Sequence, residues 1–253
     1  MKIEYVNAAL LGSASALGLN WIYDRKLLES FAKENETIFI PIQHDLYKEA
    51  KNGFDVYPNH KLGDLDFMGE VLWLFNQFLH NSKKQTAELW QETFYNYFKK
   101  DGPYDGYIEA YGKDLLKRMN NNESTNVHTE FEDKQLIGPL FILAMYPYDH
   151  SINKVQDALD YAKVLTSYNG VNYFSDLLYY LIKDLENGVD KKDALKHTIK
   201  YAPKSYQESL KKALELDDIN EFISSYSGIA CGLEQSFPLI YYIVAHSNNW
   251  EEA

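Results

Sequence analysis

The chain has a single cysteine, Cys231, among 253 residues. No disulfide can form within the chain, and a zinc site built from several cysteines is excluded. This composition is typical of proteins from a reducing compartment. The N-terminus lacks the basic region and apolar core of a signal peptide, and no run of about 18 apolar residues could span a membrane. We therefore expect a cytoplasmic protein with no membrane partner.

Clustered positive charge is also lacking. The chain has 25 Lys and Arg against 37 Asp and Glu residues, a formal net charge of −12 at pH 7. Because binding along a nucleic acid needs clustered Lys and Arg, we expect no nucleic-acid partner. A single phosphate could still bind at a helix N-terminus or through a cation.

Several catalytic signatures are absent. The sequence contains no Gly-x-Ser-x-Gly elbow of a serine hydrolase and no Gly-rich phosphate-binding loop. It also contains no pair of histidines four residues apart. A Ser–His–Asp hydrolase is therefore not supported.

Apolar residues at helical spacing are abundant. Hydrophobic residues make up 45% of the chain, including 21 Tyr and 13 Phe, which is ample for a core. A period near 3.6 recurs throughout, and two-residue alternation is nearly absent, so we predict one all-α domain of about ten helices over residues 1–253. Helical patterns cover residues 3–17, 27–33, 66–79, 87–98, 107–119, 134–145, 153–167, 173–186, 191–199, 206–214 and 228–245.

Residues 63–70 (Gly-Asp-Leu-Asp-Phe-Met-Gly-Glu) bring three carboxylates close together before an apolar run. A helix beginning near Asp64 would put this acid beside free N–H groups and the positive end of the helix dipole. Asp66 and Glu70 are four residues apart and share one helical face. Such a pair can hold a hard cation or carry out acid–base chemistry. The alternative is a capped helix start, with Asp64 as N-cap and Glu70 facing solvent.

Five segments, in order, resemble the ADP-ribosylglycohydrolase family, including its crystallin J1-related branch. Residues 12–24 end in Asn-Trp-Ile-Tyr-Asp, similar to a His-Trp-Ile-Tyr-Asp segment of that branch, and residues 63–66 fall where the family has Thr-Asp-Asp-Thr or Gly-Asp-Gln-Thr. Residues 104–109 resemble a Tyr-Asp-Gly-Tyr segment, and residues 136–140 resemble a helix that follows a polar loop. Residues 228–238 fit a Gly-x-x-Cys-x-x-Glu-x-x-x-Pro pattern.

The resemblance implies a compact, orthogonal multi-helix bundle of the ADP-ribosylglycohydrolase type. It also implies metal-assisted hydrolysis of an ADP-ribosyl glycosidic bond, with Mg²⁺ as cofactor and an ADP-ribose-like small molecule or ADP-ribosylated substrate as partner. Asp64 and Asp66 would be the catalytic and metal-ligating residues. The residues that would contact substrate are Ser13, Asn20, Trp21, Tyr104, Asp105, Gly106, Tyr107 and Glu234.

Three departures from the family pattern leave the activity open. Ser13 stands where the family has an acid, and Leu65 replaces a ligating residue. The family's late Gly-Gly-Asp segment would follow a helix like residues 250–253, where this sequence stops. We therefore expect one Mg²⁺ ion at most. The alternative is an inactive member that binds an ADP-ribose-like nucleotide, or a structural or interaction module that forms a homo-oligomer.

Local chemistry offers simpler explanations for two of these segments. Residues 104–107 combine Tyr, Asp and Gly, which favour a plain turn as much as an aromatic wall beside a ribose. Trp21 fits a core or cleft wall better than a catalytic role. Glu234 lies in an apolar helical pattern, where a partly buried carboxylate needs a partner or a raised pKa.

Overall fold

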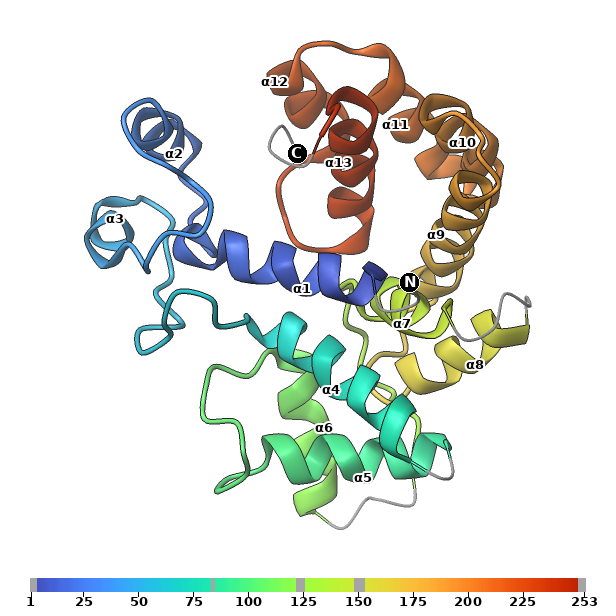
Figure 1. Ribbon diagram of the computed structural model, residues 1–253. Helices are drawn as coiled ribbons and strands as arrows, with labels where there is room; N and C mark the ends of the chain where they lie inside the picture. The colour runs from blue at the N-terminus through green and yellow to red at the C-terminus, as the bar shows by residue number, and fades with distance from the viewer. Residues whose placement is uncertain (1–3, 83–84, 122–125, 148–152, 250–253) are drawn as a thin grey trace. The chain divides into compact units, whose positions relative to one another are not determined.

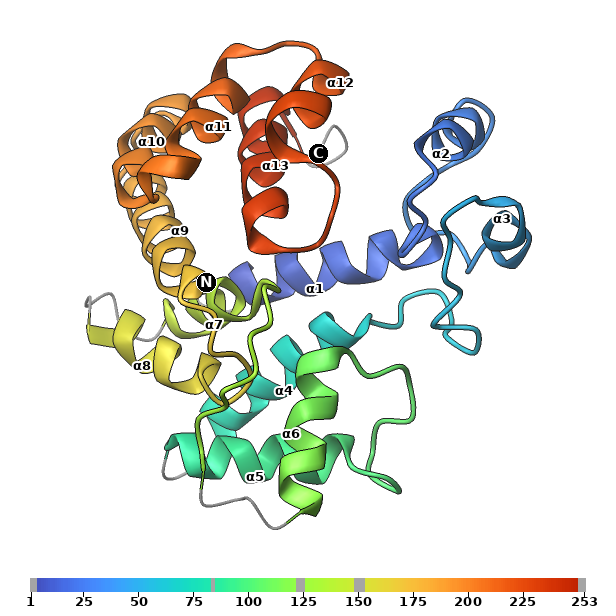
Figure 2. The ribbon, with the colours of Figure 1, turned by 180° about the vertical axis from the view of Figure 1, so that it is seen from behind.

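The computed structural model describes residues 4–82, 85–121, 126–147 and 153–249, and the regular elements in these ranges are helices (Figures 1 and 2). One isolated β-bridge pairs Ile22 with Gly53. The all-α prediction is confirmed, and the orthogonal bundle type stays a prediction. No helix in these ranges is long and apolar enough to cross a membrane. The expected helical pattern at residues 250–253 lies outside the described residues.

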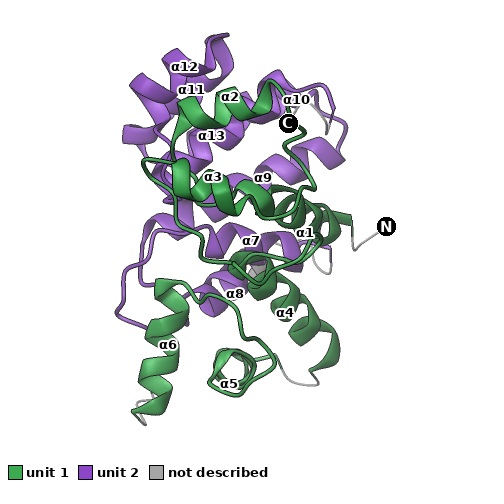
Figure 3. Cartoon of the chain, turned by 90° about the vertical axis from the view of Figure 1, so that its left-hand side faces the viewer, with its two compact units in different colours: residues 1–127 green, residues 128–253 purple. Residues whose placement is uncertain are grey.

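The chain divides into two compact units, unit 1 (Met1–Val127) and unit 2 (His128–Ala253), coloured separately in Figure 3. Each unit has its own set of packed helices and its own apolar core. The prediction of one domain over residues 1–253 stays a prediction.

In unit 1, α1 packs against α4, α4 against α5, and α5 against α6. α2 and α3 stand apart from α4–α6 in both ribbon views. The helices of unit 1 are α1 (Glu4–Ala16), α2 (Arg25–Ala32), α3 (His44–Glu49), α4 (Phe67–Asn81), α5 (Ala87–Phe98) and α6 (Ala110–Asn120), with a 3₁₀ turn at Leu17–Leu19.

The core of unit 1 is built around aromatic rings. Phe67 is fully buried, and its ring centroid lies 4.9 Å from that of Phe98 and 5.3 Å from that of Tyr111. Trp90, also fully buried, lies 5.0 Å from Phe75 by the same measure. Such edge-on and tilted pairs are favourable beyond the area they bury. They fix the first turn of α4 relative to α5 and α6.

In unit 2, α7 packs against α8 and α9, α9 against α10, and α11 against α13. The fully buried ring of Phe174 lies 5.0 Å from that of Phe237. Its helices are α7 (Ile137–Met145), α8 (Asn153–Ala162), α9 (Gly170–Glu186), α10 (Lys191–Thr198), α11 (Lys204–Glu215), α12 (Ile219–Phe222) and α13 (Leu233–His246), with a 3₁₀ turn at Ile199–Tyr201 and a π-helical turn at Ile223–Ser227.

The helix prediction differs from the structure in several places. α13 begins at Leu233 rather than near Gly228, because Gly228 has a positive φ of 76° and ends the preceding π-helical turn. Neither α3 nor α12 was predicted, since helices of six and four residues are too short to show apolar periodicity. Within α3, the Lys48 ammonium and the Asp45 carboxylate form an ion pair at 2.7 Å.

We expect Phe67→Ala to lower the free energy of unfolding by about 3–5 kcal/mol, because it empties a fully buried site between several rings. The matched control is Phe54→Ala, since Phe54 is 51% exposed. This control should cost less than about 1.5 kcal/mol, the value of one aromatic pair. Urea denaturation measures both, and equal losses would contradict the assignment of Phe67 to the core.

Candidate functional site

Asp66, and not Asp64, caps α4. The Asp66 side chain accepts a hydrogen bond from the Gly69 N–H at 2.7 Å, which is the usual role of an N-cap carboxylate. Asp64 is exposed and accepts the Lys61 N–H at 2.7 Å within the preceding turn. The alternative in which Asp64 is the N-cap was therefore wrong, because the turn holds Asp64 outside the helix.

Asp66 also gathers two of the predicted substrate contacts. The Ser13 hydroxyl donates to Oδ1 of Asp66 at 2.8 Å, and the Asn20 amide donates to Oδ2 at 3.3 Å. The Asp66 N–H donates in turn to Ser13 Oγ at 3.2 Å. A Cβ at Gly69 would overlap the Ser13 side chain, so the glycine permits this close approach. The carboxylate thus joins α1, the turn after it and the start of α4.

Burial dominates the electrostatics of Asp66. It raises the pKa of the Asp66 carboxyl, while hydrogen bonds from Gly69, Ser13 and Asn20 act in the opposite direction. Three donors to one carboxylate are the usual compensation for a charge removed from water. Both Asp66 oxygens are thereby committed to contacts within unit 1.

A cavity of about 590 Å³ lies in unit 1, between the segment that precedes α4 and the loop that joins α5 to α6. Five of the predicted site residues line it: Asp64, Tyr104, Asp105, Gly106 and Tyr107. Trp21 lies beside it, with its ring 5.5 Å from that of Tyr107. The other lining residues are Val56, Tyr57, Pro58, Asn59, His60, Glu70, Tyr97 and Pro103.

Hydrogen bonds from tyrosine side chains hold the cavity walls. The Tyr57 hydroxyl accepts the Phe67 N–H at 2.9 Å, which ties one wall to the start of α4. The Tyr104 hydroxyl donates to the Tyr107 carbonyl at 2.9 Å, and a Cβ at Gly106 would overlap the Tyr104 ring. Residues 104–107 therefore line the cavity with a bend at Gly106, and their contact with a ribose stays a prediction.

Glu70 and Tyr97 form the polar pair of this cavity. The Tyr97 hydroxyl donates to Oε2 of Glu70 at 3.1 Å. Burial raises the pKa of Glu70, and the charges of Asp64 and Asp66 raise it further, while the Tyr97 hydrogen bond lowers it. Burial and the Glu70 charge raise the pKa of Tyr97 to about 12. Glu70 thus faces the cavity, where the sequence also allowed it to face solvent.

Sequence reasoning missed Tyr57 and Tyr97 as residues of the cavity wall. The ring of His60 lies 4.8 Å from that of Tyr57 and 6.5 Å from that of Tyr104, so it belongs to the wall. The sequence did indicate Glu70, because its spacing of four from Asp66 puts both carboxylates on one helical face. It did not indicate Tyr97, because Tyr97 lies on α5, far from the motifs in sequence.

Glu234 lies in unit 2 and does not line this cavity. Its carboxylate accepts the Tyr168 hydroxyl at 2.6 Å and the Lys134 ammonium at 3.2 Å. These donors lower the pKa of Glu234. The expected need for a partner is therefore met locally, and its assignment as a substrate contact stays a prediction.

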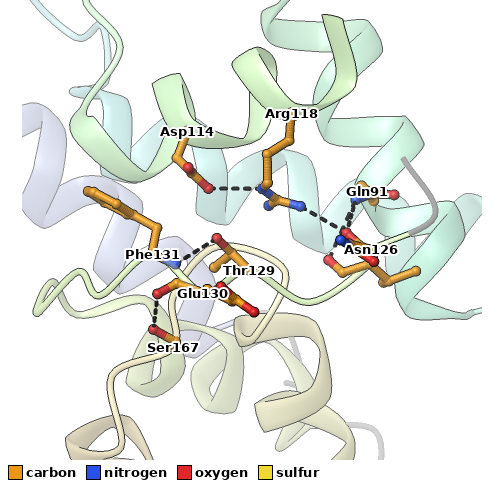
Figure 4. A network of polar contacts seen from close by, with 9 residues as sticks. Gln91, Asp114, Arg118, Asn126, Thr129, Glu130, Phe131 and Ser167 are labelled. Atoms are coloured by element: carbon orange, nitrogen blue, oxygen red, sulfur yellow. Dashed lines mark hydrogen bonds and ion pairs between the residues drawn. The ribbon is translucent and has the colours of Figure 1, made fainter. Parts of the chain in front are cut away.

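Other polar side chains join backbone segments (Figure 4). In unit 1, Arg118 pairs with Asp114 at 2.9 Å and donates to the Asn126 carbonyl at 3.0 Å, and Gln91 donates to the same carbonyl at 3.2 Å. In unit 2, the Ser167 hydroxyl donates to the Glu130 carbonyl at 2.9 Å. These contacts support loops, and none of their residues lines the cavity.

The side chains that could ligate a metal are too few for the two-cation site that the resemblance implies. Among the residues that the structure describes, no three His, Cys, Asp or Glu side chains gather in a way that could hold a metal. Asp66, one of the two expected ligands, has both oxygens engaged by protein donors. A single Mg²⁺ ion at Asp64 stays a prediction.

Comparisons of the chain with protein-family models, with characterised proteins and with solved structures gave no match. The likeness to the ADP-ribosylglycohydrolase family therefore rests on the sequence motifs alone and stays a prediction.

We expect Asp66→Ala to lower the free energy of unfolding by about 2–4 kcal/mol, since it removes the helix cap and leaves Ser13 and Asn20 without their acceptor. Asp64→Ala, which removes an exposed carboxylate from the same segment, should cost less than about 1 kcal/mol. Chemical denaturation distinguishes them. A larger loss for Asp64→Ala would contradict the assignment of Asp66 as the cap.

Glu70 should make stability depend on pH. Its folded-state pKa lies above the ordinary value of 4.5, so the folded state binds this proton more tightly than the unfolded state. Stability from this group is therefore lost as pH rises from near 4.5 through the raised pKa. Glu70→Gln has no carboxyl to titrate, so this loss should disappear. The free energy of unfolding of Glu70→Gln minus that of wild type should therefore be larger at pH 7 than at pH 4. Denaturation at both pH values measures it, with Glu92→Gln, an exposed change on α5, as the control.

Proposed function

We propose that the protein is ADP-ribosylglycohydrolase-like and that unit 1 binds an ADP-ribosyl group, with the ribose and its glycosidic bond inside the cavity. One observation carries the proposal. Residues that the family resemblance singled out in two separate segments, Asp64 in one and residues 104–107 in the other, line the same cavity. Segments of unrelated purpose would have no reason to converge in this way.

The chemistry of the walls suits a ribosyl group. Tyr57, Tyr104 and Tyr107 offer ring surfaces for a sugar or a base, and the carboxylates of Asp64 and Asp105 can accept hydrogen bonds from ribose hydroxyls. A cavity of about 590 Å³ is of ordinary size for a small-molecule site.

Charge favours the ribose end of the ligand over its pyrophosphate. Three carboxylates line the cavity, and the described lining residues include no Lys or Arg. These carboxylates would repel a pyrophosphate inside the cavity, so the pyrophosphate of the ligand lies outside it. The ammonium of Lys113, 4.5 Å from the centre of the Tyr107 ring, is a nearby cation that can pair with it.

Ligand binding without a tight two-metal centre is the role that the donor set supports best, because Asp66 is occupied as a cap and Ser13 as its partner. Hydrolysis of the glycosidic bond is the second candidate. Glu70 and Asp64 line the same cavity, and two carboxylates flanking one bond are the usual groups of glycosidases.

Calorimetry with ADP-ribose tests the binding proposal. We expect wild type to bind ADP-ribose both with Mg²⁺ and in EDTA. Tyr107→Ala should bind at least about tenfold more weakly, the value of one lost stacking partner. Tyr173→Ala, which removes an exposed tyrosine from α9, should bind as wild type does. Absence of ADP-ribose binding would contradict the proposal. Binding only with Mg²⁺ would contradict the statement that the ligand binds without a metal.

A further inference from the structure

We infer that the cavity of unit 1 is a binding site for a small organic cation, a quaternary ammonium group, held by the tyrosine rings and carboxylates of its wall. This inference goes beyond the proposed binding of an ADP-ribosyl group and does not depend on it. It concerns a ligand of opposite charge in the same cavity of about 590 Å³.

Tyrosine rings that remain partly open to a ligand line this cavity. Tyr97 lies on α5, and Tyr104 and Tyr107 lie in the loop that joins α5 to α6. All three residues are half-buried. The face of an aromatic ring is negative and attracts a cation that lies within about 6 Å of the ring centre. Several rings around one space are the usual way in which proteins hold a quaternary ammonium group.

Contacts outside the cavity fix two of these tyrosines. The Tyr104 N–H donates to the Tyr97 carbonyl at 3.2 Å, so the two residues are adjacent although they are separated in sequence. The buried ring of Phe98 lies 4.9 Å from that of Tyr97 and 5.2 Å from that of Tyr104. Because the rings are held before the ligand arrives, binding costs little of their conformational freedom.

One ring of the wall already attracts a cation of the chain itself. The Lys113 ammonium lies 4.5 Å from the centre of the Tyr107 ring. Lys113 is on α6 and does not line the cavity. Its contact therefore leaves the rings of Tyr97 and Tyr104 to a cation that enters from solvent.

Charge sets the sign of the ligand. Asp64, Glu70 and Asp105 contribute carboxyl groups to the wall, and the described lining residues include no Lys or Arg. Asp64 and Asp105 are exposed. A space lined by charges of one sign concentrates ions of the other sign, and the formal net charge of −12 acts in the same direction.

The kind of wall favours a large cation covered by methyl groups. A hard metal ion needs several oxygen ligands close together, and among the described residues no three His, Cys, Asp or Glu side chains gather in that way. A primary ammonium brings three N–H donors, which ring faces satisfy poorly. A quaternary ammonium has no N–H donor, and its methyl groups pack directly on the rings.

Calorimetry with choline tests the inference. The matched ligand is the uncharged analogue in which a tert-butyl group replaces the trimethylammonium group, since the two differ in charge and hardly in shape. We expect wild type to bind choline at least about tenfold more tightly than this analogue, the effect of one strong cation–π contact. Ethanolamine, the primary ammonium, should bind at least about threefold more weakly than choline.

Tyr104→Leu removes a ring from the wall and keeps an apolar side chain there. It should bind choline about tenfold more weakly than wild type does, with little change for the tert-butyl analogue. The matched control is Tyr173→Leu, a change of an exposed tyrosine on α9, which should bind choline as wild type does. If Tyr104→Leu fails to fold, Asp105→Asn gives a second reading. This exposed change removes one charge from the wall and should weaken choline binding about threefold.

The inference would be overturned if wild type did not bind choline, or bound choline and the tert-butyl analogue equally. Unchanged choline affinity in folded Tyr104→Leu, or in Asp105→Asn, would overturn it too, because the cation would then lie elsewhere. So would ethanolamine binding as tight as that of choline. These measurements contain no nucleotide, so their failure leaves the proposed binding of an ADP-ribosyl group standing. Absence of ADP-ribose binding, conversely, would remove that proposal and leave the cation site.

Discussion

The contacts of one carboxylate, Asp66, set the geometry on which the rest of unit 1 depends. Its oxygens accept hydrogen bonds from Ser13 on α1, from Asn20 and from the Gly69 N–H of α4. Because α4 begins where this carboxylate caps it, the positions of Phe67 in the core and Glu70 in the cavity follow from the same interaction. A charge removed from water requires such compensation, so the three donors are constrained together.

Asp66 serves the fold of unit 1 as the cap of α4 and as the acceptor for Ser13 and Asn20. Its Oδ1 accepts two of the three hydrogen bonds and its Oδ2 accepts the third. The carboxylates that line the cavity are those of Asp64, Glu70 and Asp105. Capping of the helix and lining of the cavity are thus divided among Asp64, Asp66 and Glu70, three acids on one short stretch of chain.

The fold was largely predictable where helical signals were local. The pattern over residues 87–98 matches α5 (Ala87–Phe98), because Thr86 supplies an N-cap and apolar residues recur at helical spacing. The choice between Asp64 and Asp66 as the cap was not predictable, since both acids precede the same apolar run. It depends on Ser13 and Asn20, which are distant in sequence. Tyr97 joins the site through helix packing for the same reason.

The cavity uses a short part of the chain, since its lining residues fall between Val56 and Tyr107. The contacts that close it therefore lie within unit 1 and need no residue of unit 2. During synthesis, this stretch is added to the chain before any residue of unit 2. The cavity can therefore begin to assemble on the nascent chain, while translation is still under way.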